Sequence, residues 1–471
     1  MAGMTKDEQI TALTLQVEQL QTALRAALER IAELEQRLHK NSRNSDKPPS
    51  SDGLSKKPAI PRKKGERKTG GQAGHSGKTL RAVSQPHHTQ VHPVQEAVCS
   101  CGCRLDAVAG DSDYWERRQV FDLPPTLLEV TEHRVERKTC PSCQRQHLGR
   151  FPVGVTAPVQ YGERVRALAV LLNVEQSMPL ARIQELFAGL TGHGINESTI
   201  HAAVERSFDT LAVEQDLIHQ ALRASPTAHA DETGGRIAGK LHWIHGFGSA
   251  EHTLFVVREQ RGGSVINGPD SHLAAFEGWL IHDCLASYLI MPGAVKHGLC
   301  NAHLLRELTA RMEADDPPEW PARLHELLLD AYRKSDYGRG VVEPQQRRQL
   351  KARYTAILKL ADEQEPPPVA GKRGRPKKSK GRNLYERFDK YRQAVLAFMH
   401  HAHVPFTNNL GERDLRPWKT KLKVSGCFRT LAGAQRYARI KGFCSTAKKQ
   451  GKTVFDELVN VQRGTSFLRL T

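Results

Sequence analysis

The stretch Pro226-Thr-Ala-His-Ala-Asp231 is a short run of small and apolar residues that ends in a carboxylate. A second run of this kind, Gly278-Trp-Leu-Ile-His-Asp283, follows further along the chain. Short apolar runs bounded by turn residues are typical of buried strands. We therefore expect Asp231 and Asp283 at the ends of two strands, where neighbouring strand ends can meet at one edge of a sheet.

Other strand-like runs lie around these two stretches, and helix-like segments flank them. Strands are predicted at Thr227–Asp231, Leu241–Gly248, His252–Glu259 and Gly278–His282, and upstream at Asp113–Leu123 and Leu127–Lys138. Helices are predicted at Ser264–Phe276 and Tyr288–Arg311, and the patterns of residues 310–363 and 384–403 are also helical. A group of strands that precedes long helices predicts an α/β domain within a multidomain chain.

A third acid, Glu412, lies in Thr407-Asn-Asn-Leu-Gly-Glu-Arg-Asp-Leu-Arg-Pro417 and is predicted in the first turn of a helix. Hard cations such as Mg²⁺ prefer oxygen ligands, and two ions about 3.5–4 Å apart stabilise the attacking and leaving oxygens of phosphoryl transfer. Asp231, Asp283 and Glu412 are therefore candidate catalytic residues that hold two Mg²⁺ or Mn²⁺ ions. The chain has 51 acidic residues, so an accidental grouping is the alternative.

The chain of 471 residues carries a net charge of +18, from 69 basic and 51 acidic side chains. This charge favours a polyanionic partner, which can be nucleic acid, an anionic membrane surface or an acidic protein. No run approaches the roughly 18 apolar residues of a spanning helix, and the N-terminus has no apolar signal core. We therefore expect a cytoplasmic, nucleoid-associated protein with about two to four folded units.

Residues 7–39 carry apolar residues at alternating steps of three and four, which places them on one seam of a helix. These positions are Ile10, Leu13, Val17, Leu20, Leu24, Ala27, Ile31, Leu34 and Leu38. The heptads predict a coiled coil over residues 1–40 and, through it, a homo-oligomer. The alternative is an amphipathic helix that packs on its own chain. Residues 41–90 are rich in Ser, Pro, Lys, Arg and Gly and are expected to form a basic flexible linker.

Five of the nine cysteines lie in Cys99-Ser-Cys-Gly-Cys103 and Cys140-Pro-Ser-Cys143. Two knuckles separated by a loop are typical of a structural zinc site, so residues 91–150 are predicted to bind one Zn²⁺. Zinc needs four ligands, and we favour Cys101, Cys140 and Cys143 with one of Cys99 or Cys103. Reduced thiols without a metal are the alternative.

Residues 151–222 read as helices, at Glu163–Gln176, Pro179–Leu190 and Asn196–Phe208. A Gly-rich turn, Thr191-Gly-His-Gly-Ile195, separates the last two, and Asn196 or Ser198 can cap the last one. The pattern is compatible with a helix-turn-helix that reads DNA, although helical bundles also contain it.

Basic residues gather at two places. Arg373-Gly-Arg-Pro376 resembles an AT-hook, in which Arg373 and Arg375 would lie in a minor groove, and a basic flexible linker is the alternative. A second group follows Glu412 and leads into a basic C-terminal region, residues 421–471. The candidate DNA-binding residues are Arg373, Arg375, Arg413, Arg416, Lys419 and Lys423.

Four residues are candidates for supporting roles near the acids. Cys300 and His303 have helical spacing and share a face, so they can position substrate or the metal shell; core packing is the alternative. Asn408 and Asn409 can cap the helix that presents Glu412.

These stretches, in their order, resemble the motifs of DDE transposases of the insertion-sequence-sixty-six family. The matching stretches are residues 41–52, the cysteine knuckles, Ala230–Thr233, Trp279–Asp283, Cys300–His303, Asn408–Pro417 and Lys423–Arg429. Together these stretches cover most of the chain and are specific for the family, whereas a single stretch would not be specific. The chain departs from the family in the irregular first knuckle and in Gly411, where Ala is expected.

The resemblance implies an RNase-H-like catalytic core at residues 223–420, with a helical insertion at about 312–400 and with Asp231, Asp283 and Glu412 as metal ligands. It also implies a leucine-zipper-like N-terminus and a zinc-binding module. The expected activity is metal-dependent nicking of transposon ends and strand transfer to target DNA, with accessory transposition proteins as further partners. The alternatives are a non-catalytic zinc-containing DNA-binding protein and a metal nuclease that cuts without joining.

Overall fold

The computed structural model of the chain divides into two units, Met1–Ser55 with Phe151–Thr471, and Lys56–Arg150. Besides a few isolated positions, the structure describes residues 6–38, 82–90, 97–105, 118–121, 127–139, 141–143, 146–291, 293–368 and 378–469. None of the helices in these ranges is long and apolar enough to cross a membrane.

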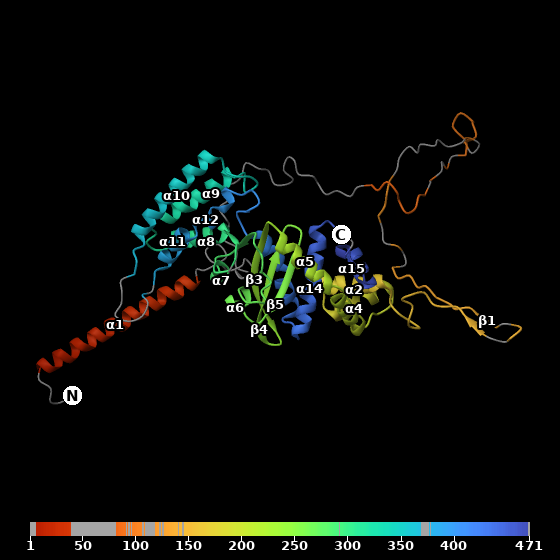
Figure 1. Ribbon diagram of the computed structural model, residues 1–471, viewed down its shortest axis with the longest axis horizontal. Coiled ribbons are helices and arrows are strands. Elements are labelled where there is room, and N and C mark those ends of the chain that lie inside the picture. Colours follow the sequence, from red (N-terminus) through yellow and green to blue (C-terminus); the bar gives the residue numbers. More distant parts are fainter. Residues whose placement is uncertain are drawn as a thin grey trace. The chain divides into compact units, whose positions relative to one another are not determined.

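In its described part, the larger unit is built on a five-stranded mixed sheet (Figure 1). Its strands are β3 (Thr227–Ile237), β4 (Lys240–Gly248), β5 (Thr253–Arg258), β6 (Trp279–His282) and β7 (Lys296–Leu299). They lie in the order β5-β4-β3-β6-β7. Neighbours among β3, β4 and β5 are antiparallel, whereas β6 is parallel to β3 and β7 is parallel to β6. The strands that carry the two predicted aspartate motifs are therefore neighbours.

Strand β3 is longer than predicted, and this changes the position of Asp231. The expected strand ended at Asp231, but β3 continues to Ile237 and turns into β4 through Ala238 and Gly239, which both have positive φ. A two-residue turn of this kind matches the twist of a hairpin. A Cβ atom at Gly235 would lie 3.0 Å from the side chains of Ile244 and Leu422, so this glycine permits close packing rather than ending the strand.

The two faces of the sheet are covered by different helices. On one face, Ile237, Ile244 and Phe255 pack with α13 (Asn409–Ser425) and α14 (Leu431–Lys449). On the other face, Ala228, Ala230 and Phe247 pack with α5 (Ala212–Ala224). Successive strand residues point to opposite faces, so Asp231 points toward the α13 side and Glu232 toward the α5 side.

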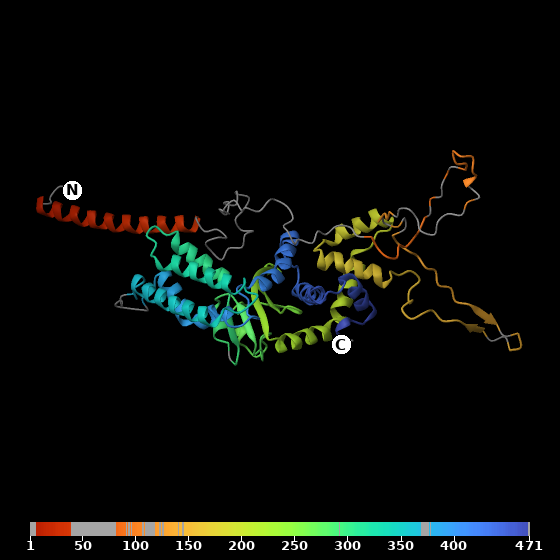
Figure 2. The same cartoon turned by 90° about the horizontal axis from the view of Figure 1, so that it is seen from above.

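A helical body packs on β6 and β7 at one end of the sheet (Figure 2). It consists of α8 (Asn301–Met312), α9 (Trp320–Lys334), α10 (Pro344–Gln364), α11 (Lys380–Lys390), α12 (Arg392–Val395) and the 3₁₀ turn η4 (Ala397–Met399). Trp320 and Phe388 are fully buried in its core, which also includes Ile281 and Leu299 of the sheet. The prediction of helices across this region is confirmed.

Helices from both ends of residues 151–471 form a second group in the larger unit. They are α2 (Glu163–Val170), η3 (Leu171–Glu175), α3 (Leu180–Thr191), α4 (Glu197–Thr210), α15 (Val454–Arg463) and η5 (Phe467–Arg469). The three helices predicted between residues 163 and 208 are confirmed, with one π-helical turn, η3, that was not expected. Asn196 caps α4 as expected, because its side chain accepts the backbone N–H of Ser198 at 3.0 Å.

Two helix predictions are wrong. The predicted helix Ser264–Phe276 is only the single turn α6 (Gly263–Ile266). The predicted helix Tyr288–Arg311 divides into α7 (Ala286–Leu289), strand β7 and α8. A Cβ atom at Gly298 would lie 2.6 Å from Cδ1 of Ile281, so this glycine allows β7 to lie against β6.

The C-terminal residues belong to the same packed unit as the sheet. Helix α13 runs across residue 420, where a separate basic region was expected to begin. Helix α14 follows, and the side chains of Ile440 and Phe443 are buried against the strands. Helix α14 carries several cations and is nevertheless a core helix, because the consecutive residues from Ile440 to Cys444 are buried on all its sides.

Near the N-terminus, α1 (Lys6–Leu38) confirms the predicted helix. Its described apolar side chains are exposed, among them Leu13, Leu20 and Leu24. The coiled coil stays a prediction, which these exposed positions favour. Residues 41–81 of the predicted linker lie outside the described residues.

In the smaller unit, the described residues form one short pair of antiparallel strands, β1 (Arg137–Thr139) and β2 (Gln146–Leu148). The strand predicted at Leu127–Lys138 is wrong over residues 127–136, and residues 118–121 of the strand predicted at Asp113–Leu123 are not extended into a sheet. Val120 and Val130 are 90% and 82% exposed, so these two side chains do not pack into a core of the described residues.

Candidate active site

Three carboxylates from different elements meet on the α13 side of the sheet. Asp231 lies in the middle of β3, Asp283 directly follows β6, and Glu412 is in the first turn of α13. Asp231 experiences the negative charges of both Asp283 and Glu412. The structure therefore brings together all three acids that the sequence singled out, with Asp231 supplied from within its strand rather than from its end.

The electrostatics of these acids are those of a cation site. Burial, followed by repulsion from Glu232, Asp283 and Glu412, raises the pKa of Asp231 to about 7. Burial and repulsion from Glu232 also raise the pKa of Asp283. The donors are carboxylate oxygens, which suit hard cations such as Mg²⁺ or Mn²⁺, and a cation there would relieve their mutual repulsion. The residues present therefore fit the divalent metal that the motifs imply.

Glu232, Arg261 and Tyr288 form a second polar group beside this site. Arg261 Nη2 lies 2.6 Å from Glu232 Oε1 and 4.0 Å from Asp283 Oδ2, and the Tyr288 hydroxyl donates to Glu232 Oε2 at 2.7 Å. The Glu232 side chain is buried, and the Arg261 guanidinium stacks over Trp243. The sequence analysis did not predict this group. The available signal was Glu232 itself, because an acid that follows Asp231 in a buried strand points to the opposite face of the sheet and needs a polar partner there.

Cys300 and His303, for which a supporting role near the acids was predicted, lie beside Glu412. Cys300 precedes α8 and is fully buried, and His303 is in the first turn of that helix. His303 Nδ1 and Arg306 Nη2 each lie 3.8 Å from Glu412 Oε1. Although burial disfavours the imidazolium, interaction with Cys300 and Glu412 raises the pKa of His303 to about 9.

Asn408 joins the sheet to the helix of Glu412. Its Oδ1 accepts from His229 Nδ1 at 2.8 Å, its Nδ2 donates to the Ala230 carbonyl at 2.9 Å, and its backbone N–H donates to Cys300 Sγ at 3.1 Å. The prediction that its side chain caps α13 is wrong, because that side chain is used on β3. A Cβ atom at Gly411 would lie 2.9 Å from Asn408 Oδ1, which explains glycine where alanine was expected.

We expect Asn408→Ala to loosen α13 from the sheet. The change removes two side-chain hydrogen bonds and leaves buried groups of His229 and Ala230 unpaired, which should lower the free energy of unfolding by about 2–4 kcal/mol. Thermal unfolding measures the loss. The neighbouring Asn409 is exposed, so Asn409→Ala should stay within about 0.5 kcal/mol, and equal losses in both variants would contradict the role of Asn408.

The raised pKa of Asp231 predicts a pH-dependent stability of the protein without Mg²⁺. The folded chain holds the Asp231 proton with a pKa of about 7, against an ordinary value of 3.8, so the stability that this group contributes is fully present below about pH 4 and is lost as the pH rises through 7. Asp231→Asn should therefore raise the free energy of unfolding by about 2–4 kcal/mol at pH 8 and little at pH 4. Calorimetry at both pH values tests this, and an equal change at both would contradict it.

The cations predicted to bind DNA are partly described. Arg413, Arg416, Lys419 and Lys423 are exposed on α13, at steps of three and four that place them along one side of the helix that begins beside Glu412. Arg373 and Arg375 lie outside the described residues. Helix α4, the second helix of the predicted helix-turn-helix, instead exposes acidic side chains, including Glu197 and Asp209.

Four of the five clustered cysteines are described, and Cys140 lies outside the described residues. The first knuckle is a tight turn in which the Cys99 N–H donates to the Cys103 carbonyl and the Gly102 N–H donates to the Cys99 carbonyl, both at 2.8 Å. Hydrogen bonds from the backbone and side chain of Cys101 lower the pKa of the Cys99 thiol. The sulfur donors of Cys99 and Cys101 thus lie on one turn, as a zinc knuckle requires.

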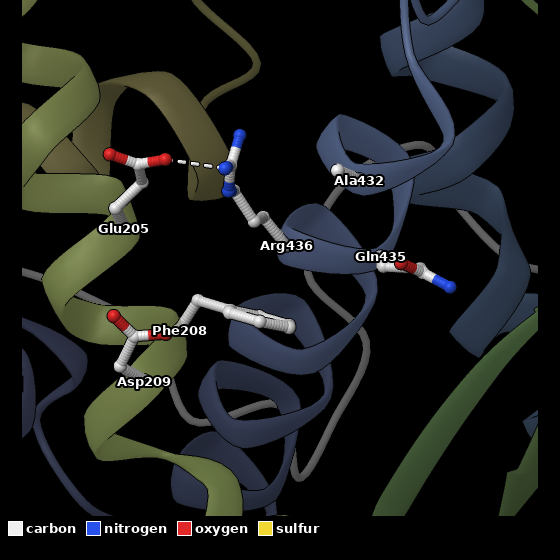
Figure 3. Close-up of a pocket in the computed structure, with 6 residues that line it drawn as sticks. All are labelled: Glu205, Phe208, Asp209, Ala432, Gln435 and Arg436. Atoms are coloured by element: carbon white, nitrogen blue, oxygen red, sulfur yellow. Dashed lines mark hydrogen bonds and ion pairs between the residues drawn. The ribbon is translucent and has the colours of Figure 1, made fainter.

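A surface pocket lies apart from these carboxylates. It lies between α4 and α14 and is lined by Glu205, Phe208, Asp209, Ala432, Gln435 and Arg436 (Figure 3). Arg436 forms an ion pair with Glu205 across it. The charge of Arg436 is already partly neutralised by the acids that line the pocket with it. We therefore assign no ligand to this pocket.

Comparison with known families agrees with the geometry. Residues 158–436, more than half of the chain, match the Transposase IS66 family, and residues 96–144 match the zinc-finger binding domain of transposase IS66. Residues 5–81 match a family of unknown function, DUF6444. No curated protein matches the chain. All three carboxylates lie within the matched residues 158–436, and the chain belongs to the IS66 family of transposases.

Proposed function

We propose that this transposase nicks DNA at transposon ends and joins the freed 3′ end to target DNA at a site made by Asp231, Asp283 and Glu412. The observation that carries the proposal is their convergence from β3, β6 and α13 into one mutually repelling group. Carboxylates that repel one another are stabilised by divalent cations. A pair of Mg²⁺ ions would supply the activation of water or the 3′-hydroxyl and the stabilisation of the leaving oxygen.

The arrangement of the core supports an RNase-H-like fold for residues 223–420. The sheet has three antiparallel strands followed by two parallel ones. Its central strand, β3, carries Asp231, and the neighbouring strand β6 ends directly before Asp283. In the chain, the helices α9 to α12 follow α8 and precede α13, which supports a helical insertion ahead of Glu412. In this view Asn408 holds Glu412 against β3, and Arg261 holds the Glu232 carboxylate away from the metal ligands.

The exposed cations of α13 are the proposed contact for DNA phosphates next to the cleavage site. They extend from Glu412 along one side of the helix, whereas the exposed residues of α4 include the acids Glu197 and Asp209 beside Arg206. A phosphate backbone that follows α13 would therefore reach the carboxylates. The predicted AT-hook arginines and the helix-turn-helix remain proposals that could add contacts to DNA.

We expect the double variant Lys419→Ala, Lys423→Ala to weaken DNA binding at every sequence. Each lost phosphate contact lowers the slope of log affinity against log salt concentration by about 0.9, so the slope should fall by about 2. Binding titrations at several salt concentrations measure it. Lys359→Ala, an exposed lysine of α10, is the matched control and should leave the slope unchanged. A slope that is the same in all three proteins would remove α13 from the interface.

The other modules support assembly on DNA. We propose that Cys99 and Cys101, with Cys140 and Cys143, hold the zinc ion, because the turn of the first knuckle brings the Cys99 and Cys101 groups together. We also propose that α1 pairs with a second copy through its exposed heptad residues. Accessory transposition proteins are further proposed partners.

One assay distinguishes this function from its alternatives. Labelled transposon-end DNA and a target plasmid are incubated with the full chain and Mg²⁺, and bound, nicked and joined DNA are scored separately. We expect nicked and joined products. Nicks without joining would indicate a metal nuclease, and binding without nicks would indicate a non-catalytic DNA-binding protein.

A further inference from the structure

Cys300, His303 and Glu412 place a sulfur, a nitrogen and an oxygen donor together at the border of the carboxylate site. One donor atom from each residue lies within 4.8 Å of the other two. Cys300 and His303 come from the start of α8, and Glu412 comes from the first turn of α13. The backbone of Asn408 fixes the two helix starts together through its N–H bond to Cys300 Sγ.

Two donors of this cluster are buried without hydrogen-bond partners. His303 Nδ1 and Glu412 Oε1 have none among the described residues, and their separation of 3.8 Å is too long for a hydrogen bond. Buried polar atoms are usually satisfied, so an unpaired nitrogen and an unpaired oxygen that lie side by side indicate a missing partner. A cation between the donors would satisfy both atoms.

We propose that Cys300, His303 and Glu412 bind a thiophilic divalent ion such as Zn²⁺, and that this ion inhibits the Mg²⁺-dependent reaction by withdrawing Glu412 from the carboxylate site. Thiolate, imidazole and carboxylate are ordinary zinc ligands, whereas Mg²⁺ favours oxygen alone. A zinc ion about 2.0–2.3 Å from each donor needs only small side-chain rotations from the present geometry, and water completes its shell. The Cys300 thiol and the protonated His303 imidazole each give up a proton to solvent on binding.

The surroundings support metal access and a metal thiolate. The side chains of His303 and Glu412 are 18% and 28% exposed, so an ion can reach them from solvent, although Cys300 is fully buried. The Asn408 N–H that points at Cys300 Sγ would stabilise a thiolate. Arg306 competes for the same oxygen of Glu412, from 3.8 Å, and removing it should strengthen zinc binding.

Cobalt absorption tests metal binding by Cys300, His303 and Glu412. This test does not depend on the reaction that the protein catalyses. The full chain is first supplied with one equivalent of Zn²⁺, which the four-cysteine zinc-finger domain takes before a site with a single thiolate, and it is then titrated with Co²⁺. We expect one further equivalent with thiolate-to-cobalt charge-transfer absorption in the wild type and in Cys444→Ser, whose cysteine is equally buried in α14. Cys300→Ser and His303→Ala should lose this absorption. Its absence from the wild type, or its persistence in Cys300→Ser, would overturn the proposal.

The inhibition rests on the proposed role of Glu412 and has its own test. Zn²⁺ should inhibit Mg²⁺-dependent nicking, with an inhibitory concentration raised more than about 10-fold in Cys300→Ser, since even outer-shell partners of metal ligands change affinity 10–100-fold. Arg306→Ala should bind Co²⁺ more tightly. Asp231→Asn should be inactive but keep the cobalt absorption, so a wrong catalytic assignment and a wrong zinc site give different results. Equal inhibition of wild type and Cys300→Ser would refute the inhibitory role.

Discussion

Asp283→Asn is expected to abolish nicking and joining of transposon ends with Mg²⁺, with a rate at least about 10³-fold below wild type. A carboxylate that holds the metal acts on charge that develops in the transition state, and groups of that kind contribute factors of this size. Asparagine keeps the shape and keeps an oxygen that can accept the Leu285 N–H, the bond that Asp283 Oδ1 makes at 2.9 Å. The change therefore removes charge with little effect on the local fold.

The controls separate catalysis from folding and from DNA binding. Asp270→Asn removes an exposed carboxylate and should keep wild-type rates. End binding by Asp283→Asn should equal that of the wild type, and its melting temperature should not fall, because burial and repulsion raise the pKa of Asp283 in the metal-free fold. More than a tenth of wild-type nicking in this variant would refute the carboxylate site.

Much of this site could be predicted from the sequence because its signals are local. Asp283 follows a short apolar run, and the structure places it immediately after β6. Glu412 follows two asparagines at the start of a helix, and it lies in the first turn of α13. In both cases the neighbours in the chain determine the backbone that holds the acid, so one stretch of sequence is sufficient.

The features that sequence reasoning missed depend on partners far away in the chain. The strand was predicted to end at Asp231, but it continues through Gly235, where the absence of a side chain allows Leu422 of α13 to pack on β3. Asn408 looked like a helix cap, but its side chain bonds to His229 and Ala230, which are almost 180 positions away. Local propensity cannot show such contacts, since they exist only once sheet and helix are packed.

The second large effect is expected from the zinc-finger domain, where Cys143→Ser should remove one equivalent of zinc per chain and unfold the domain. Its described apolar side chains, such as Val120 and Val130, are mostly exposed, and its described strands are three residues each. Because the described residues of the domain form no apolar core, we expect folding to depend on the metal, and structural zinc contributes about 10–16 kcal/mol in finger peptides. Loss of one of four ligands should therefore leave too little free energy for folding.

Zinc content and limited proteolysis test this domain separately from the catalytic unit. We expect rapid cleavage within residues 96–144 in Cys143→Ser, while the unfolding transition of the sheet and its helices stays unchanged, because the two units have separate packing. Cys427→Ser changes an exposed cysteine next to α13 and should keep all zinc. Transposon-end binding by Cys143→Ser then shows what the domain contributes: a loss with the catalytic unit intact would assign end recognition to the zinc-finger domain. Full zinc content in this variant would mean that Cys103 replaces Cys143 or that Cys143 is not a ligand, and it would contradict the four-cysteine site proposed above.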